Sequence, residues 1–288
     1  MRLFVFGLGF SASAFVREAK DRFDWIGATT RSPEKAEAMR AQGITPFLFD
    51  GTKKGDGIAD ALARATHVLV SIAPDTEGDP VLLHHRDDLE AARPGWIGYL
   101  STVGVYGNHD GAWVDEDTPV MPVSKRSHQR VAAENAWLML SRKTGIPVQI
   151  FRLSGIYGPG RNAFVNFEKG KARRLVKPGQ VFNRIHVDDI AGALMAAVSR
   201  EPSTRIFNVT DDEPAPPQDV VAHAAELLGV TPPPEQDFET ADLSPMARSF
   251  YGENKRVSNE RVKEELGYRF RFPDYRAALA ALHRDGWH

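Results

Sequence analysis

The chain opens with an apolar strand that runs directly into a tight glycine turn. Residues 2–6 are apolar after Arg2, Gly7 and Gly9 follow at once, and Ala12 stands three positions later. The first glycine permits a sharp turn, the second lets the backbone approach a diphosphate, and a small third residue lets the next helix pack closely. The pattern predicts a dinucleotide-binding unit; an ordinary glycine turn before a surface helix is the alternative. The expected cofactor contacts are Gly7, Gly9, Phe10, Ser11 and Ala12.

The bulk composition excludes several classes of function. With 36 basic and 38 acidic residues the formal charge is −2, which gives no support for a nucleic-acid partner. The absence of cysteine excludes disulfides, thiolate metal ligands and cysteine nucleophiles. We expect a cytoplasmic protein without a membrane partner, because there is no signal-peptide pattern and no apolar run of about 20 residues. The length of 288 residues suits a main domain with a smaller lobe.

Apolar strands alternate with helical segments through the first half of the chain. Strands are expected at residues 2–6, 25–30, 44–49, 67–72, 96–101 and 148–153. Helices are expected at residues 13–21, from Pro33, and at 58–65, 81–92 and 123–143. This alternation indicates βαβ units and a parallel sheet covered on both faces. The predicted fold class is therefore α/β, a Rossmann-type doubly wound parallel sheet.

The second half has a different organisation and predicts a smaller C-terminal substrate lobe. A helix at 188–199 and a strand at 205–209 are expected to return to the main sheet. Further helices are expected at 219–228 and, most clearly, at 254–268. The predicted dinucleotide-binding domain spans 1–155 with 187–210, and the smaller lobe spans 156–186 and 211–288. In an open α/β sheet a ligand binds beyond the carboxyl ends of the strands, so this lobe should cover the cofactor.

The end of the second strand predicts which cofactor is preferred. An NAD site places a carboxylate there, but this chain reads Thr29-Thr30-Arg31-Ser32. Because Arg31 can pair with a 2′-phosphate, we expect NADP(H), with NAD possible and a solvated loop arginine as the alternative. Asp50, before Gly51, is expected either to contact adenine or only to form an Asp-Gly turn. Ala73 and Pro74 close the fourth strand, where backbone normally runs beneath the diphosphate and ribose.

Four passages carry a resemblance to a known family. They are Gly-Leu-Gly-Phe-Ser-Ala (7–12), Leu-Ser-Thr-Val-Gly-Val-Tyr-Gly (100–107), Phe-Arg-Leu-Ser-Gly-Ile-Tyr-Gly-Pro-Gly-Arg (151–161) and Arg-Ile-His-Val-Asp-Asp-Ile-Ala (184–191). The chain resembles the extended short-chain dehydrogenases/reductases, in the nucleotide-sugar epimerase and dehydratase branch. The resemblance implies that Ser154 lies near the nicotinamide. It also implies a homodimer built from the helices at 81–92 and 123–143.

The sequence departs from this family at the catalytic positions. The family uses a Ser or Thr on the fifth strand, followed by a Tyr and, four residues later, a Lys. The resemblance places the first role on Thr102, with Ser101 beside it. Arg126 occupies the Tyr position and Arg130 the Lys position, and no Tyr-x-x-x-Lys occurs in the chain. Because arginine cannot act as a general base, the chain looks like the atypical members that lack the catalytic Tyr.

Other residues near these motifs admit two interpretations each. Arg130 could instead form an i,i+4 ion pair with Glu134. Tyr106 could replace the missing proton donor, although the family's tyrosine there is usually structural. His186 could contact substrate or be a buried, hydrogen-bonded histidine, with Asp188 expected to cap the following helix. Further candidate substrate contacts are Arg161 and Arg184.

Two functions remain in competition at this point. The first is an NADP-dependent oxidoreductase or epimerase that acts on a polar small molecule, possibly like a nucleotide sugar. The second is a non-catalytic NADP(H) sensor or regulatory protein, which the loss of the Tyr and Lys favours. The motifs at 154–161 and 184–189 favour the enzyme, because a sensor does not need a substrate site. No metal site is expected, since His84, His85 and His186 lack zinc-ligand spacing.

Overall fold

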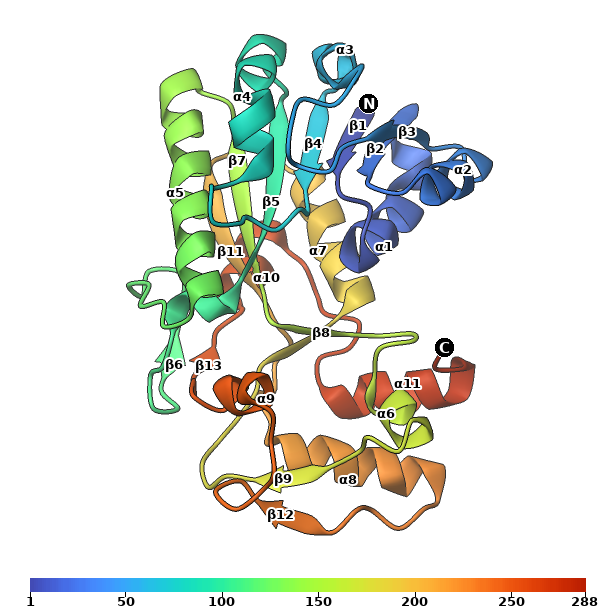
Figure 1. The fold of residues 1–288 in the computed structure, drawn as a ribbon, viewed down its shortest axis with the longest axis vertical. Helices are drawn as coiled ribbons and strands as arrows, with labels where there is room; N and C mark the ends of the chain where they lie inside the picture. The colour runs from blue at the N-terminus through green and yellow to red at the C-terminus, as the bar shows by residue number, and fades with distance from the viewer.

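A seven-stranded parallel sheet forms the centre of the molecule in the computed structural model, which describes residues 1–245 and 248–288 (Figure 1). The strand order is β11-β7-β5-β4-β1-β2-β3, and every neighbouring pair is parallel. The strands are β1 (Arg2–Phe6), β2 (Trp25–Thr30), β3 (Thr45–Leu48), β4 (His67–Val70), β5 (Trp96–Thr102), β7 (Val148–Leu153) and β11 (Arg205–Val209). The predicted Rossmann-type sheet is confirmed.

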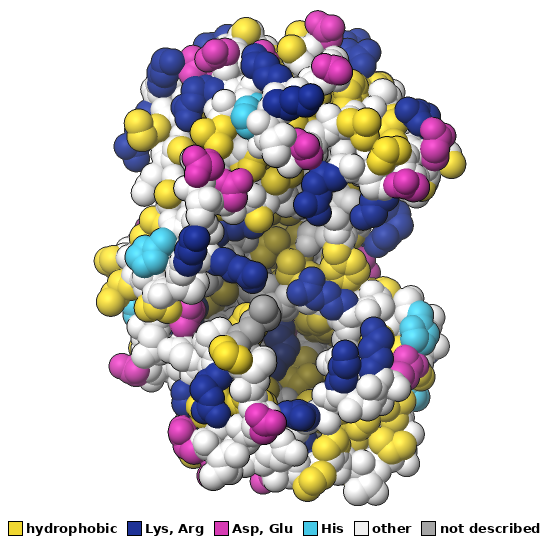
Figure 2. All heavy atoms as spheres, viewed as in Figure 1, with side chains coloured by type: hydrophobic (Ala, Val, Ile, Leu, Met, Phe, Trp, Pro, Cys, Tyr) yellow, Lys and Arg dark blue, Asp and Glu magenta, His cyan; other side chains and the backbone are white. Residues whose placement is uncertain are grey.

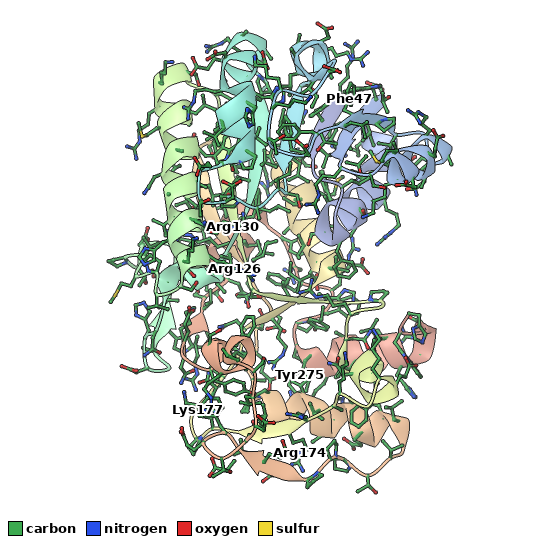
Figure 3. The ribbon with its side chains drawn as sticks, viewed as in Figure 1. Phe47, Arg126, Arg130, Arg174, Lys177 and Tyr275 are labelled. Carbon is green, nitrogen blue, oxygen red and sulfur yellow. The ribbon has the colours of Figure 1, made fainter. Side chains whose placement is uncertain are left out.

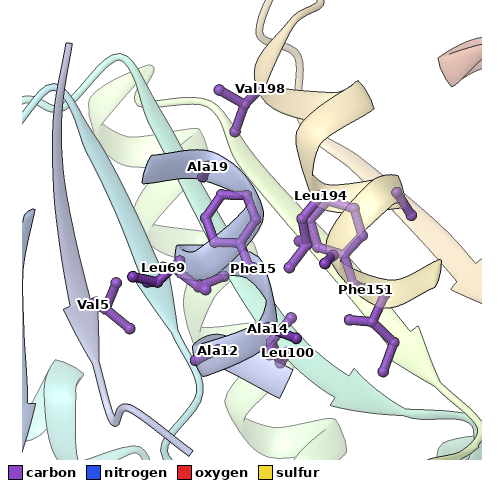
Figure 4. Close-up of a cluster of buried hydrophobic side chains, with 14 of the residues drawn as sticks. Val5, Ala12, Ala14, Phe15, Ala19, Leu69, Leu100, Phe151, Leu194 and Val198 are labelled. Carbon is purple, nitrogen blue, oxygen red and sulfur yellow. The ribbon is translucent and has the colours of Figure 1, made fainter. Parts of the chain in front are cut away.

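Helices cover both faces of this sheet. One face carries α1 (Phe10–Ala19), α2 (Pro33–Ala41) and α7 (Val187–Val198), and the other carries α3 (Ile58–Arg64), α4 (Pro80–Ala92) and α5 (Lys125–Thr144). Alternate β1 side chains enter the two cores, with Val5 on the α1 side and Phe4 on the α5 side. Figure 4 shows Phe15 of α1 beside Leu69 and Leu194 of α7 beside Phe151, in one buried cluster that also includes Val5. Ala12 is fully buried at the start of α1, where a larger side chain would separate the helix from the sheet.

A smaller lobe lies below the carboxyl ends of the strands (Figure 1). Its main elements are α6 (Ala163–Glu168), β9 (Arg174–Val176), α8 (Pro217–Leu228), β12 (Glu235–Asp237), α9 (Pro245–Phe250) and α11 (Tyr275–Asp285). The paired strands β8 (Gly155–Tyr157) and β10 (Arg184–His186) connect it to the sheet. The strands β6 (Trp113–Val114) and β13 (Arg256–Val257) form a second short parallel pair. Among the described residues, every helix is too short or too polar to cross a lipid bilayer.

One predicted helix does not form over the expected range, and several others begin at different residues from those expected. The expected helix at 254–268 is wrong: β13 comes first, and α10 spans only Glu260–Leu266. The Arg256 N–H donates to the Ala112 carbonyl at 2.9 Å, so pairing with a distant strand overrides the local helical pattern. The helix α10 packs on α7 and β11 rather than within the smaller lobe. The helix expected from Ser13 begins at Phe10, and the one expected from Val123 begins at Lys125 after the N-cap Ser124.

Candidate functional site

The glycine turn has the geometry that an anion-binding helix start requires. Gly7 has a φ of 87°, and its N–H donates to Thr29 Oγ1 at 2.8 Å. A Cβ on Gly7 would lie 2.9 Å from Ile72 Cγ1, whereas a Cβ on Gly9 would meet nothing within 4 Å. Gly9 is the N-cap of α1 and offers no side-chain acceptor to the first N–H groups of the helix. The N–H groups of Gly7, Leu8 and Gly9 bond to Thr29 or within the turn, so the donors left for a diphosphate are the first N–H groups of α1, beside the open space at Gly9.

The other predicted cofactor contacts surround this turn. Phe10 is 38% exposed, while Ser11 and Ala12 point into the core and can offer only backbone atoms. Arg31 follows β2 directly and is exposed, without a hydrogen-bond or ion-pair partner among the described residues. Ala73 and Pro74 come after the carboxyl end of β4.

Asp50 and Ser154 make local contacts. Asp50 accepts from the Thr52 N–H at 2.9 Å, and the Thr52 hydrogen bonds lower the pKa of its carboxyl group. The Asp-Gly turn is therefore present, and the adenine contact stays a prediction. Ser154 is buried after β7, and its N–H donates to the Val209 carbonyl at 3.2 Å.

Thr102 and Ser101 stand at the carboxyl end of β5, opposite Leu153 and Arg152 of β7. Thr102 is half-buried, and its Oγ1 accepts from the Gly104 N–H at 3.1 Å. Its own hydroxyl proton is free to donate to a ligand. Ser101 differs, because it is buried and donates to Glu134 Oε1. Of the two, Thr102 is the residue that can contact a substrate.

The two arginines at the Tyr and Lys positions differ from each other. Arg130 is anchored: its guanidinium donates to the Tyr99 hydroxyl at 3.0 Å and to the Leu100 carbonyl at 2.8 Å. Burial raises the pKa of Tyr99, so that hydroxyl stays protonated. Arg126 is exposed one turn earlier and has no partner among the described residues. Both labels lie on the part of α5 that borders the gap between sheet and lobe in Figure 3, and Figure 2 shows this region hollowed and flanked by basic side chains.

The expected ion pair between Arg130 and Glu134 is wrong. Glu134 instead pairs with Arg152 of β7 at 2.7 Å, and both side chains are at most 5% exposed. Arg152 also donates to the Tyr106 hydroxyl at 2.9 Å, and that hydroxyl donates to Asn208 Oδ1 at 2.8 Å. Arg130 is thus left free of a carboxylate partner among the described residues.

The interpretation of Tyr106 as proton donor is also wrong. Its side chain is fully buried in the network just described, and burial raises the pKa of Tyr106 to about 12. A buried hydroxyl with both a donor and an acceptor partner has a structural role. Sequence reasoning missed Arg152 and Asn208, which complete this network from β7 and β11. Their position as polar residues inside otherwise apolar strands was the available signal.

The substrate-side residues fall into exposed and buried groups. Arg161 is exposed, and its side chain has no partner among the described residues. His186 is 2% exposed, and its Nδ1 accepts from the Asp188 N–H at 3.3 Å. His186 rather than Asp188 therefore caps α7, and the expected Asp188 cap is wrong; Asp188 pairs with Arg17 at 3.1 Å. Burial lowers the pKa of His186, which favours a neutral ring.

Arg184 is half-buried at the base of the smaller lobe. Its guanidinium donates to the carbonyls of Phe182 at 2.9 Å and Ala215 at 3.0 Å. Sequence reasoning missed two residues beside it, Tyr157 and Asp211. The available signal for Asp211 was its place just past the carboxyl end of a parallel strand, where ligands bind.

Comparisons with known proteins agree with this architecture. Residues 89–210 match the model of the NAD dependent epimerase/dehydratase family. A functionally unknown conserved protein from Silicibacter pomeroyi is 50% identical, with a TM-score of 0.89 over 99% of this chain and 98% of that one.

Two further solved structures share the fold at lower identity. UDP-glucuronic acid 4-epimerase from Bacillus cereus, in complex with UDP-glucuronic acid and NAD, is 17% identical with a TM-score of 0.79, covering 99% of this chain and 98% of that one. The human epimerase family protein SDR39U1 with NADPH is 18% identical with a TM-score of 0.73, covering 99% and 100%. The chain is thus similar to the NAD dependent epimerase/dehydratase family over residues 89–210, and its fold is that of these epimerase structures.

Proposed function

We propose that this protein binds NADP(H) across the carboxyl ends of β1, β2 and β4. The observation that carries the proposal is the glycine turn, which leads into the uncapped first turn of α1 and leaves open space at Gly9. Structural neighbours in complex with NAD and with NADPH support a nicotinamide dinucleotide. Arg31 favours the phosphorylated form, because it follows β2 exposed and unpaired among the described residues.

Calorimetric titration of NADPH and NADH tests the cofactor preference. We expect wild type to bind NADPH more tightly, and Arg31→Ala to lose about tenfold or more in NADPH affinity while NADH affinity stays unchanged. Arg40→Ala is the matched control, because Arg40 is exposed on the next helix and pairs there with Glu37. Equal affinity of the wild-type protein for both cofactors would remove the proposal of NADP preference.

The reaction we propose is NADP-dependent redox chemistry, as an oxidoreductase or epimerase, on a polar substrate in the gap between sheet and lobe. Arg126 and Arg130 cannot remove a proton, but their guanidinium groups can donate to a substrate oxygen that gains negative charge. Thr102 adds a hydroxyl donor from β5. These residues stabilise and orient the reacting oxygen, and Arg130 is held in place for this role by Tyr99 and Leu100.

NADPH oxidation across aldehydes, ketones and nucleotide sugars tests this reaction. For a substrate that turns over, we expect Arg126→Ala to lower kcat by about 10²-fold without changing NADPH affinity or thermal stability. Arg142→Ala, an exposed arginine near the other end of α5, serves as the control. Tight NADPH binding without turnover of any substrate, unaffected by Arg126→Ala, would favour the non-catalytic sensor. The homodimer and the cytoplasmic location stay predictions.

A further inference from the structure

Three polar side chains meet beneath the junction of the sheet and the smaller lobe, outside the arginine pair of α5. Asp211 lies two residues beyond β11, and its N–H donates to the Arg184 carbonyl at 2.7 Å. Strand β10, which carries Arg184, pairs with β8, so that His186 stands opposite Tyr157. The rings of His186 and Tyr157 pack edge to face at 5.4 Å. These contacts bring the three residues close together, and the Tyr157 hydroxyl interacts electrostatically with both Asp211 and Arg184.

The polar groups of this cluster are not satisfied by the protein itself. Asp211 is 1% exposed, and neither of its carboxyl oxygens has a hydrogen-bond partner among the described residues. The buried Tyr157 hydroxyl likewise has none. Arg184 uses a single nitrogen for the carbonyls of Phe182 and Ala215, and it forms no ion pair with a described carboxylate. Buried polar groups without partners are uncommon in proteins and point to a role in binding.

The charges of the cluster favour an anionic ligand. Burial raises the pKa of Asp211 to about 8, so this carboxyl group is mostly neutral at pH 7 and can donate a hydrogen bond. The charged groups that face Asp211 are Arg184 on β10, the adjacent residue Asp212, and Asp274 before the start of α11. The Glu213 N–H lies near the Asp211 carboxyl group but forms no hydrogen bond with it. The Tyr157 hydroxyl also donates. Asp212 pairs with Lys263 at 3.0 Å, and Asp274 accepts from the Ala277 N–H at 2.8 Å, so one cation and two neutral donors are left for a ligand.

We propose that Arg184, Asp211 and Tyr157 bind a carboxylate of the substrate, which makes the substrate of this protein an organic acid. A planar guanidinium matches a carboxylate, and a carboxylic acid proton donates well to a second carboxylate. The proposal rests on the proposed function, because it names the substrate class of the same site.

The position of the cluster suits one small molecule that also reaches the nicotinamide. Thr102 stands opposite Leu153 in the sheet, and Tyr157 follows Leu153 by four residues, or at most about 14 Å of chain. Tyr275 of α11, labelled in Figure 3, lies across the gap from Arg126 and Arg130 and also interacts electrostatically with Arg184. The carboxylate would therefore bind at the lobe, and the reacting oxygen at α5.

Formate is the direct probe, because its small size lets it enter the site whatever the rest of the substrate is. We expect crystals soaked in sodium formate to hold the ion against Arg184, and calorimetry to detect its binding to the NADPH-loaded protein. Arg184→Gln and Tyr157→Phe should weaken formate binding by about tenfold or more, whereas Arg142→Gln should not. Removal of the unpartnered Tyr157 hydroxyl should not lower thermal stability, which separates a binding role from a structural one.

Protonation of Asp211 gives a second readout. Formate affinity should fall about tenfold for each pH unit above 8 in wild type, because the carboxyl must regain its proton to bind an anion. Asp211→Asn should keep the affinity at pH 7 and remove this dependence. Absence of formate from soaked crystals, or wild-type affinity in Arg184→Gln and Tyr157→Phe, would overturn the inference. NADPH titrated into the same samples tests the proposed function separately, since the cofactor can bind when formate does not.

Discussion

At the scale of single residues, Glu134 connects the candidate site to the sheet. It accepts from Ser101 of β5 and pairs with Arg152 of β7, where both partners of the ion pair are buried. We expect Glu134→Gln to lower the free energy of unfolding by about 3 kcal/mol, because Arg152 would keep a buried charge without a partner.

Urea denaturation measures this loss. Glu90→Gln is the control: the Lys143 side chain in its ion pair is 68% exposed, so the loss there should stay below about 1 kcal/mol. Equal losses in the two variants would contradict the role given to Glu134.

The same residues show what sequence can and cannot reveal at this scale. The replacement of Tyr and Lys by Arg126 and Arg130 is readable directly from the motif. The partner of Arg130 is not, because the i,i+4 spacing to Glu134 predicts a helical ion pair. Arg152 lies 18 residues beyond Glu134 on a strand and forms the buried pair instead. Spacing along a helix does not show whether a residue pairs with a neighbour on the same helix or with a residue that the tertiary fold brings close.

At the scale of elements, the turn between β1 and α1 contains two glycines with different roles. Substituting each of them distinguishes an effect on stability from an effect on cofactor binding. Gly7→Ala should destabilise the protein by about 1–2 kcal/mol, because a side chain there has an unfavourable φ and approaches Ile72. Gly9→Ala should leave stability nearly unchanged, since its Cβ meets nothing within 4 Å, yet weaken NADPH binding. Thermal denaturation and calorimetry on both variants measure this. Unchanged NADPH affinity in Gly9→Ala would place the diphosphate elsewhere.

Elements with strong local signals were predictable, and those made by distant pairing were not. Buried strands such as Val148–Leu153 and the capped helix α5 follow from apolar runs and capping residues. Strand β13 has two residues and exists because it pairs with β6, about 140 positions earlier in the chain. Its neighbour α10 was consequently expected to be longer than it is.

At the scale of the whole molecule, the alternation of strands and helices was enough to predict the central sheet. Contacts between the sheet and the smaller lobe were not predictable, because they join residues from separate parts of the chain. Asp211 follows the last sheet strand, Arg184 precedes α7 and Tyr157 follows β7. No sequence spacing relates them; the pairing of β8 with β10 and the hydrogen bond from the Asp211 N–H to the Arg184 carbonyl bring them together.

Asp211 also predicts how the stability of the whole protein depends on pH. Its pKa is about 8 when folded and near the ordinary 3.8 when unfolded, so the folded state binds the extra proton between these values. The stabilisation that this proton gives to the folded state is complete below about pH 4. It decreases as the pH rises and is lost once the pH has passed through 8. We therefore expect the unfolding free energy of wild type, relative to Asp211→Asn, to fall by up to about 4 kcal/mol between pH 5 and pH 8.5.

Urea denaturation at a series of pH values measures this difference. Burial also raises the pKa of Asp79, Asp189 and Glu116, but these groups are present in both proteins and cancel in the comparison. Asp56→Asn removes an exposed carboxylate and serves as the control. Its unfolding free energy should depend on pH as that of wild type does. If the unfolding free energy of Asp211→Asn changes with pH in the same way as that of wild type, Asp211 is charged in the folded protein. It would then repel a carboxylate at Arg184, so this stability measurement tests the substrate class without any ligand.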